Sequence, residues 1–174
     1  MDRLEQPIVE VLDPLQLSIT VGNEDVRILN EGWPVEVDAV LPRIGYSITR
    51  HGVALVRQFE RQGVYVANSS NGITQSRDKL HAGQLLSHNR IPIPTTCYVR
   101  TWQDVERAIR LIGGMPVVIK VNEGTQGSGV HLIHSREQAE QKTYKMLSEG
   151  HDVLVQQYIE ESHGRDVRVL VVGG

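Results

Sequence analysis

A glycine-rich segment between two apolar stretches is the feature that most constrains the fold of this chain. Residues 117–121 and 130–133 have the short, apolar, β-branched composition that is typical of strands. Phosphate loops and dinucleotide-binding loops are followed by a helix, whereas here a second strand pattern follows. The sequence therefore predicts a hairpin whose tip can cover a polyphosphate through backbone N–H groups, with an ordinary turn as the alternative. The tip consists of Gly124, Thr125, Gln126, Gly127, Ser128 and Gly129.

Lys120 lies inside the first of these strand patterns. Alternation turns the odd-numbered apolar residues toward a core and puts Lys120 and Val118 on the opposite face. An ammonium group without a partner is costly to bury, so a lysine there requires an anion, and a phosphate beside the glycine-rich tip would supply it. A lysine on a solvated strand face is the alternative, and the residue pattern by itself leaves both open.

A third segment, residues 154–159, predicts a strand that leads into a linker. The edge of such a strand can present backbone N–H and C=O groups to an adenine, while a plain core strand is the alternative. Asp166 follows shortly afterwards and could accept hydrogen bonds from ribose hydroxyl groups. The alternative for Asp166 is a residue that simply ends a strand.

The first half of the chain alternates strand and helix patterns, which is the rhythm of a parallel α/β layer. The helix pattern begins at Thr49 and ends at Gly63, a residue that tolerates the left-handed conformation. We expect strands at residues 8–12, 38–42 and 64–68 and a hairpin over residues 17–29.

The second half has an α+β rhythm. A helix over residues 74–89 is followed by Pro92 and Pro94, so we expect a joint there that divides the chain into domains of residues 1–90 and 91–174. Ser135 and Gln138 form a capping box for a later helix. Further expected elements are strands at residues 95–99, 152–159 and 166–172 and a helix that begins at residue 101.

Composition excludes several classes of function. The net charge of −3, from 18 Lys and Arg against 21 Asp and Glu, provides no basic surplus, so we expect no DNA partner. No stretch approaches the roughly 18 apolar residues of a membrane span, so we expect no membrane partner. The single cysteine, Cys97, fits a reducing compartment, and we expect a cytoplasmic location. His131 and His134 point to opposite faces of a strand, so we expect no histidine metal site.

In combination, these segments resemble the RimK-type ATP-grasp amino-acid ligases. The matching segments follow the family order across nearly the whole chain, and the strings Arg-Asp-Lys and Glu-Gly-Thr-Gln-Gly are the most specific of them. They are Leu12-Asp13-Pro14-Leu15, Pro42-Arg43-Ile44-Gly45, Arg77-Asp78-Lys79-Leu80, Lys120 with Glu123-Gly124-Thr125-Gln126-Gly127, Val155-Gln156-Gln157-Tyr158-Ile159, and Asp166-Val167-Arg168.

The resemblance implies a fold, an activity and partners. The fold is a partial pre-ATP-grasp, Rossmann-like layer followed by the first part of an ATP-grasp domain. The activity is ATP-dependent ligation of glutamate or a similar amino acid to a protein or peptide carboxylate through an acyl phosphate, and a ribosomal protein is one such acceptor. The implied cofactors are ATP and Mg²⁺, or Mn²⁺ in place of Mg²⁺.

The resemblance also assigns roles to residues. Lys79 and Lys120 would hold the phosphates, the segment from Gly124 to Gly129 would close over them, and Asp166 would bind the ribose. The adenine would lie beside Gln156, between the backbone groups of Gln157 and Tyr158. The family usually has an acidic residue at the position of Gln157, which puts any role of that side chain in doubt. The resemblance identifies no catalytic residue here.

Finally, the resemblance implies that the chain is truncated at both ends: the strand and helix that open the family's fold are missing before residue 8, and its metal-binding carboxylates and asparagine lie beyond Gly174. We therefore expect this chain alone to be an inactive fragment whose open edges favour self-association into homo-oligomers. One alternative is a non-catalytic nucleotide-binding or interaction module on the same scaffold. Another is a member of the same superfamily that is similar to glutathione synthetase or to the carboxylases.

Overall fold

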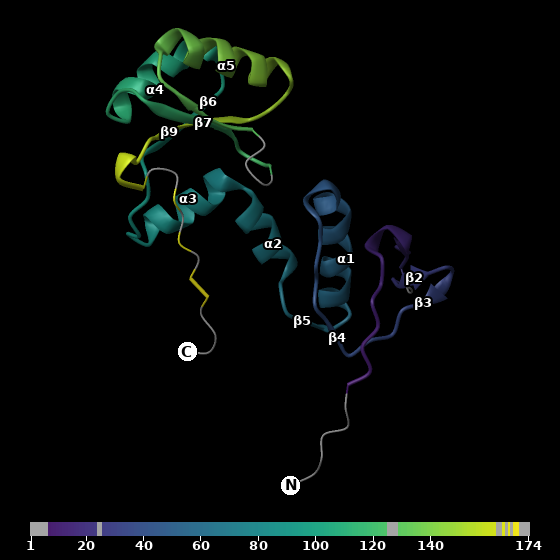
Figure 1. Cartoon of the computed structure of the whole chain (residues 1–174). Helices are drawn as coiled ribbons and strands as arrows, with labels where there is room; N and C mark the ends of the chain where they lie inside the picture. Colours follow the sequence, from purple (N-terminus) through teal and green to yellow (C-terminus); the bar gives the residue numbers. More distant parts are fainter. Residues whose placement is uncertain are drawn as a thin grey trace. The chain divides into compact units, whose positions relative to one another are not determined.

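The chain forms two compact units, Met1–Gln75 and Ser76–Gly174 (Figure 1). Each unit has its own core. The structure is a computed structural model. It describes residues 7–23, 26–124, 129–162, 165, 167 and 169–170.

The first unit contains two small sheets and a helix. The strands β1, β2 and β3 form an antiparallel sheet in that order, and β4 pairs in parallel with β5. The helix α1 connects β4 to β5, so the expected hairpin and the expected parallel strand–helix–strand layer are both confirmed. The bounds are β1 Leu17–Ile19, β2 Ile28–Asn30, β3 Trp33–Pro34, β4 Ala39–Val40, α1 Thr49–Arg61 and β5 Tyr65–Val66.

The helix α1 is held by its apolar face. Val53, Val56 and Phe59 are 7%, 2% and 4% exposed. Phe59 also belongs to the core of this unit, together with Leu17, Ile28 and Leu55. After the helix, Gly63 has a φ of +78°, a backbone conformation that costs an L-residue about 1–2 kcal/mol.

The strand expected at residues 8–12 is not formed. Ile8, Val9 and Val11 are 100%, 80% and 92% exposed, and residues 8–12 pair with no strand among the described residues. A strand requires a hydrogen-bonded neighbour, and an alternating sequence cannot supply one by itself.

The helix expected over residues 74–89 is two helices, α2 (Ser70–Arg77) and α3 (Lys79–His88). Asp78 separates them because its backbone is extended, with φ −85° and ψ 103°, and its side chain caps α3. The boundary between the two units falls inside α2, whereas the sequence placed the domain joint at residues 90–91. The difference arises because α3 is hydrogen-bonded to the second unit through Asn122.

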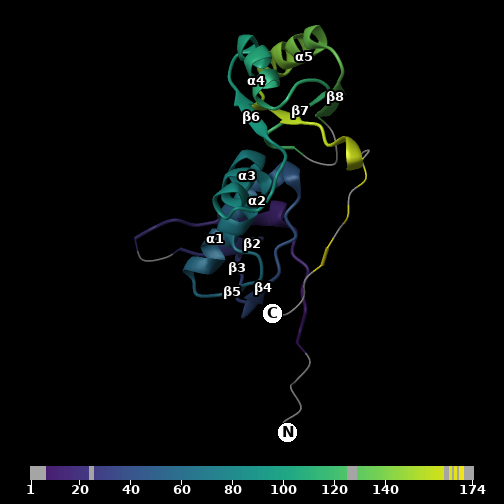
Figure 2. The same ribbon diagram turned by 90° about the vertical axis from the view of Figure 1, so that its left-hand side faces the viewer.

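The second unit is an antiparallel sheet in the order β6-β9-β7-β8. The helices α4 and α5 cover one face of this sheet, and α3 lies on its other side (Figures 1 and 2). Ser135 accepts a hydrogen bond from the backbone N–H of Gln138 and so caps α5, as expected. The bounds are β6 Thr96–Val99, α4 Val105–Leu111, β7 Val117–Val121, β8 Val130–Ile133, α5 Arg136–Ser148 and β9 Val153–Gln157.

The two faces of this sheet differ in chemistry. Val117, Ile119 and Val121 of β7 belong to the core under the helices, and Lys120 lies on the opposite face, as alternation predicted. β7 and β8 form the expected hairpin, in which Lys120 is opposite Val130.

Two other expectations concern the last predicted strand and membrane-spanning segments. The strand expected over residues 166–172 lies largely outside the described residues. In the part of the chain that the structure describes, none of the helices is long and apolar enough to cross a membrane.

Candidate functional site

Lys120 projects from the middle of the sheet, and a neutral amide is its hydrogen-bond partner. Its Nζ donates to Gln156 Oε1 at 2.9 Å, and Gln156 Nε2 donates in turn to Thr96 Oγ1 at 2.6 Å. Leu154, opposite Lys120 on β9, is 1% exposed, so the stem of the lysine lies against a buried apolar neighbour. Within the described ranges, Lys120 forms no ion pair, and its charge therefore has no anionic counterpart there.

Lys79 is the first residue of α3 and points back to the end of β7. Its Nζ donates to the backbone oxygen of Asn122 at 2.9 Å, and its backbone N–H donates to the same oxygen at 3.4 Å. A carbonyl oxygen holds the ammonium in place but does not neutralise it.

Asn122 directly follows β7 and is 6% exposed. Its Oδ1 accepts from the backbone N–H of Leu80 at 2.8 Å, and its Nδ2 donates to Asp78 Oδ1 at 3.0 Å. Its own backbone N–H donates to the Asp152 carbonyl oxygen at 2.8 Å. The sequence analysis did not single out Asn122. The sequence does contain one signal that could have identified Asn122, because it is a polar residue between an apolar strand and a glycine-rich tip.

The two lysines lie close enough for their charges to interact. Burial lowers the pKa of Lys120, and the positive charge of Lys79 lowers it further. Burial also lowers the pKa of Lys79, while the carboxylates of Glu123 and Asp78 act in the opposite direction. The hydrogen bond from the His81 backbone N–H lowers the pKa of Asp78, which keeps this carboxylate charged. A bound anion near both ammonium groups would therefore be stabilised by them.

The hairpin tip begins and ends with glycines that the structure describes. Gly129 has a φ of +86°, and its carbonyl oxygen accepts from the Val121 backbone N–H at 3.1 Å. A Cβ atom at position 129 would lie 3.0 Å from Val121 Cγ2, so both the backbone and the available space favour glycine. Gly124 also lies in the described part, whereas Thr125, Gln126, Gly127 and Ser128 lie outside the described residues.

The residues expected around the adenine are only partly free for that role. The Gln157 backbone N–H donates to the Thr95 carbonyl oxygen at 2.9 Å, so this group is used within the sheet. The Gln156 side chain is occupied by Lys120 and Thr96. Tyr158 follows β9 and is half-buried. Asp166, expected at the ribose, lies outside the described residues.

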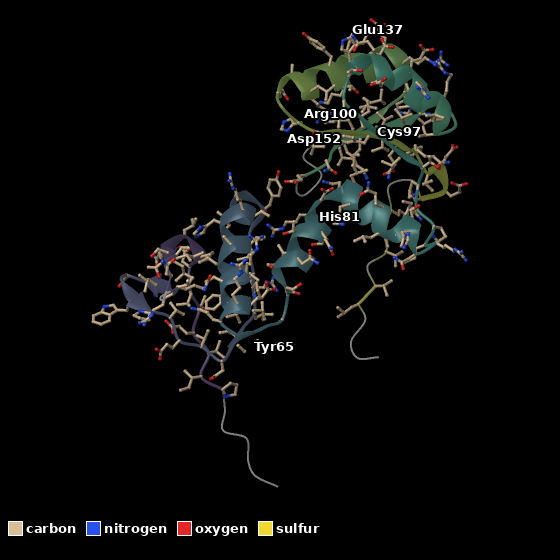
Figure 3. All side chains as sticks on the ribbon, turned by 180° about the vertical axis from the view of Figure 1, so that it is seen from behind. Tyr65, His81, Cys97, Arg100, Glu137 and Asp152 are labelled. Atoms are coloured by element: carbon tan, nitrogen blue, oxygen red, sulfur yellow. The ribbon has the colours of Figure 1, made fainter. Side chains whose placement is uncertain are left out.

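A second polar cluster flanks the site. Arg100 pairs with Asp152 (Figure 3). Both contact the Tyr98 hydroxyl group, which accepts from Arg100 and donates to Asp152 Oδ1 at 2.7 Å. Asp152 thereby joins this exposed cluster to Asn122 through its backbone oxygen. Among the described residues, no group of three or more His, Cys, Asp or Glu side chains is placed to hold a metal ion. The site thus gathers two lysines, the amides of Asn122 and Gln156, and the carboxylates of Asp78 and Glu123.

Comparison with known families matches both units. The sequence profile of the RimK-like ATP-grasp domain matches residues 76–174, and that of the RimK PreATP-grasp domain matches residues 5–73. The gap between the two matches adjoins the boundary between the compact units.

Individual proteins agree with these profiles. A probable alpha-L-glutamate ligase of Aeromonas salmonicida is 45% identical over 167 residues, which are 95% of this chain and 56% of that protein. A protein of the same name from Rhodopirellula baltica is 51% identical, over 94% of this chain and 41% of its own length. The chain therefore spans about half the length of these relatives.

A solved structure shows the same fold. The crystal structure of a RimK-domain ATP-grasp protein from Sphaerobacter thermophilus matches with a TM-score of 0.58 and 26% sequence identity. The match covers 72% of this chain and 48% of that one.

Proposed function

Since this chain belongs to the RimK-like ATP-grasp family, we propose that it binds the phosphates of ATP for the ligation of glutamate, or a similar amino acid, to a carboxylate. The observation that carries the proposal is the pair of lysines. Lys120 and Lys79 interact through their charges beside the root of the glycine-rich tip, and Lys120 has a neutral amide as its partner.

A polyphosphate fits this arrangement of charges. Each ammonium group already gives one hydrogen bond to a neutral oxygen, and each has further N–H donors. Hydrogen bonds to a charged group contribute about 1.5–3 kcal/mol. An anion would also offset the repulsion between Lys79 and Lys120, which favours its binding over that of a neutral ligand.

The glycine-rich tip supports the same proposal. The tip of the hairpin has Gly124 and Gly129 at its two ends, so the backbone N–H groups of these two residues can approach a phosphate without an intervening side chain. In our proposal, residues 124–129 cover the phosphates, Gln156, Gln157 and Tyr158 lie beside the adenine, and Asp166 binds the ribose.

The proposed chemistry activates a carboxylate, because oxide is a poor leaving group. The carboxylate oxygen attacks the γ-phosphorus, the bond to the β-phosphate oxygen breaks, and ADP leaves. The amino group of glutamate then attacks the acyl phosphate, loses a proton and displaces phosphate, which leaves an amide. The lysines of this chain contribute by orienting the phosphates and by stabilising their charge.

Other parts of the proposal come from the family alone. We propose a protein or peptide carboxylate as the acceptor, a ribosomal protein being one candidate, and a divalent metal ion, Mg²⁺ or Mn²⁺, which lowers the charge of the phosphates when it is bound. Among the described residues, no group of three or more His, Cys, Asp or Glu side chains could hold this ion.

Calorimetric titration of the chain with ATP and with adenosine tests the proposal. Lys120→Met should weaken ATP binding about 10- to 100-fold and adenosine binding far less, because the ammonium group holds the phosphates and reaches the adenine side only through its hydrogen bond to Gln156. The control is Lys145→Met, which removes an exposed lysine of α5. Equal losses in both variants would overturn the proposal. ATP binding without amide formation from glutamate and an acceptor peptide would favour the non-catalytic module.

A further inference from the structure

We propose that Asn122, together with Asp78, is a positioning residue that holds Lys79 beside Lys120 on the phosphate side of the sheet. This inference rests on the proposed function, since it assigns Lys79 to the same ligand. It concerns residues 43 and 44 positions apart in the sequence, which the fold brings into hydrogen-bond contact.

The first argument is that Asn122 and Asp78 together complete the beginning of α3. The first N–H groups of a helix have no partner within the helix. Here the N–H of Lys79 donates to the Asn122 backbone oxygen, that of Leu80 to Asn122 Oδ1, and that of His81 to Asp78 Oδ1. These N–H groups are therefore used within the protein, and recognition of an anion falls to the Lys79 side chain.

The second argument is that Asn122 holds the Lys79 side chain as well as its backbone. The Nζ and the backbone N–H of Lys79 share one acceptor, the Asn122 carbonyl oxygen. This double contact fixes the ammonium at the end of β7, where the chain turns into the glycine-rich tip. A lysine carries about 2 kcal/mol of rotamer entropy, so holding it before the ligand arrives removes part of the cost of binding.

The third argument is that Asn122 itself cannot shift easily. It is almost fully buried, its Nδ2 donates to Asp78, and its backbone N–H donates to the Asp152 carbonyl oxygen. Asn122 lies two residues after Lys120 and two residues before Gly124. Asn122 thus lies between the strand lysine and the root of the tip, its backbone oxygen accepts from the helix lysine, and its side chain bonds to Asp78 and Leu80.

The chemistry of the position requires an amide. Asparagine supplies an acceptor for Leu80 and a donor for Asp78 at the same time. Aspartate would keep the acceptor, lose the donor and place a second carboxylate against Asp78. Alanine would leave the Leu80 N–H without its Asn122 acceptor and would remove one donor from Asp78 Oδ1, which still accepts from the His81 N–H.

The test measures Lys79 directly and then through its ligand. In isotope-labelled protein without nucleotide, the Cε resonance of Lys79 is followed against pH in the wild type, Asn122→Ala and Asn122→Asp. The matched control is Asn89→Ala, which removes an exposed asparagine at the other end of α3 that donates to Leu85. We expect Asn122→Ala to move the Lys79 titration toward that of an ordinary lysine and the Asn89→Ala control to leave it unchanged, while Asn122→Asp shows the effect of an added carboxylate on the same titration.

The second readout is a double-mutant cycle. Asn122→Ala should weaken ATP binding about tenfold and leave adenosine binding unchanged, but it should add nothing in a Lys79→Met background, because the effect passes through Lys79. Additive losses would overturn the inference. Asn122→Ser, which keeps an acceptor for Leu80, replaces Asn122→Ala if the latter does not fold.

The two proposals fail in different ways. Absence of ATP binding in the wild type would overturn the proposed function. An unchanged Lys79 titration in Asn122→Ala would overturn the positioning role, whatever the affinity for ATP.

Discussion

The helices α1 and α3 are held by opposite means. Six residues of α1 are buried, and its apolar face packs into a core, whereas α3 has no buried residue among its ten. The beginning of α3 is fixed instead by hydrogen bonds to Asn122 and by its cap, Asp78. Packing in a core stabilises a helix but positions no charged group for a ligand. Hydrogen bonds at the beginning of a helix can position a charged side chain without burying it in a core. The helix that carries the candidate phosphate lysine is therefore the one with the weaker packing.

The largest expected effect on stability is in α1. Phe59→Ala should lower the free energy of unfolding by about 3–5 kcal/mol, because it opens a cavity in the core beside Leu17 and Ile28. Urea denaturation followed by circular dichroism measures this change. A loss below about 1 kcal/mol would contradict the view that packing holds α1.

The corresponding change in α3 is Asp78→Ala. It removes the cap and should cost about 1–2 kcal/mol of stability, less than the change in α1. Its effect on ATP binding should nevertheless be larger than that of Phe59→Ala, because Asp78 also contacts Asn122. Urea denaturation measures the stability of both variants, and calorimetry measures their affinity for ATP. The reverse order of the two effects on ATP would break the comparison.

The pH dependence of binding sharpens the comparison. Burial and the positive charge of Lys79 lower the pKa of Lys120. Its ammonium group therefore loses its proton at a lower pH than that of an ordinary lysine, whose pKa is about 10.4. A polyphosphate favours the charged form, so ATP affinity should be constant near neutral pH and decrease as the pH rises through the lowered pKa. Calorimetric titrations at a series of pH values between about pH 7 and pH 10, just below the ordinary lysine pKa, measure this decrease in ATP affinity.

Lys120→Arg is the control for the pH dependence, since arginine stays charged over the whole range. Its affinity should decrease less steeply with pH, and the remaining slope should come from Lys79. An identical slope in both proteins would exclude Lys120 as the titrating group.

The smallest expected effect is at the exposed side of α3. Leu85 is 39% exposed. Leu85→Ser should change stability by no more than about 0.5–1 kcal/mol, because little buried area is lost. The same denaturation experiment measures it, and a change as large as that of Phe59→Ala would show that α3 is held by packing after all.

Much of the fold could be predicted from the sequence because it depends on local patterns. The hairpin of β7 and β8, the face of Lys120, the length of α1 and the cap of α5 all follow from alternation, helical spacing or a capping residue. The exposed residues 8–12 show the limit of such reasoning, because alternation favours a strand only where a neighbouring strand exists.

Of the candidate site, the sequence predicted Lys120 as a residue in need of a partner, while Lys79 came only from the resemblance to a family. Asn122 was missed because its role depends on contacts with residues more than 40 positions away. The break between α2 and α3 was missed for a related reason. In the sequence, Asp78 has the character of an ordinary surface residue within a helical pattern. In the structure, its side chain caps α3 and contacts Asn122, and these interactions stabilise its extended backbone.

The amino-acid sequence by itself determined that an apolar strand carries a lysine on one face and leads into a glycine-rich tip. Those properties reside in neighbouring residues and in the two-residue period of a strand. Only the tertiary structure decided which groups surround that lysine and where Lys79 is held. The reason is physical: a hydrogen bond between a strand end and a helix beginning depends on distance in space, which the order of residues along the chain does not specify.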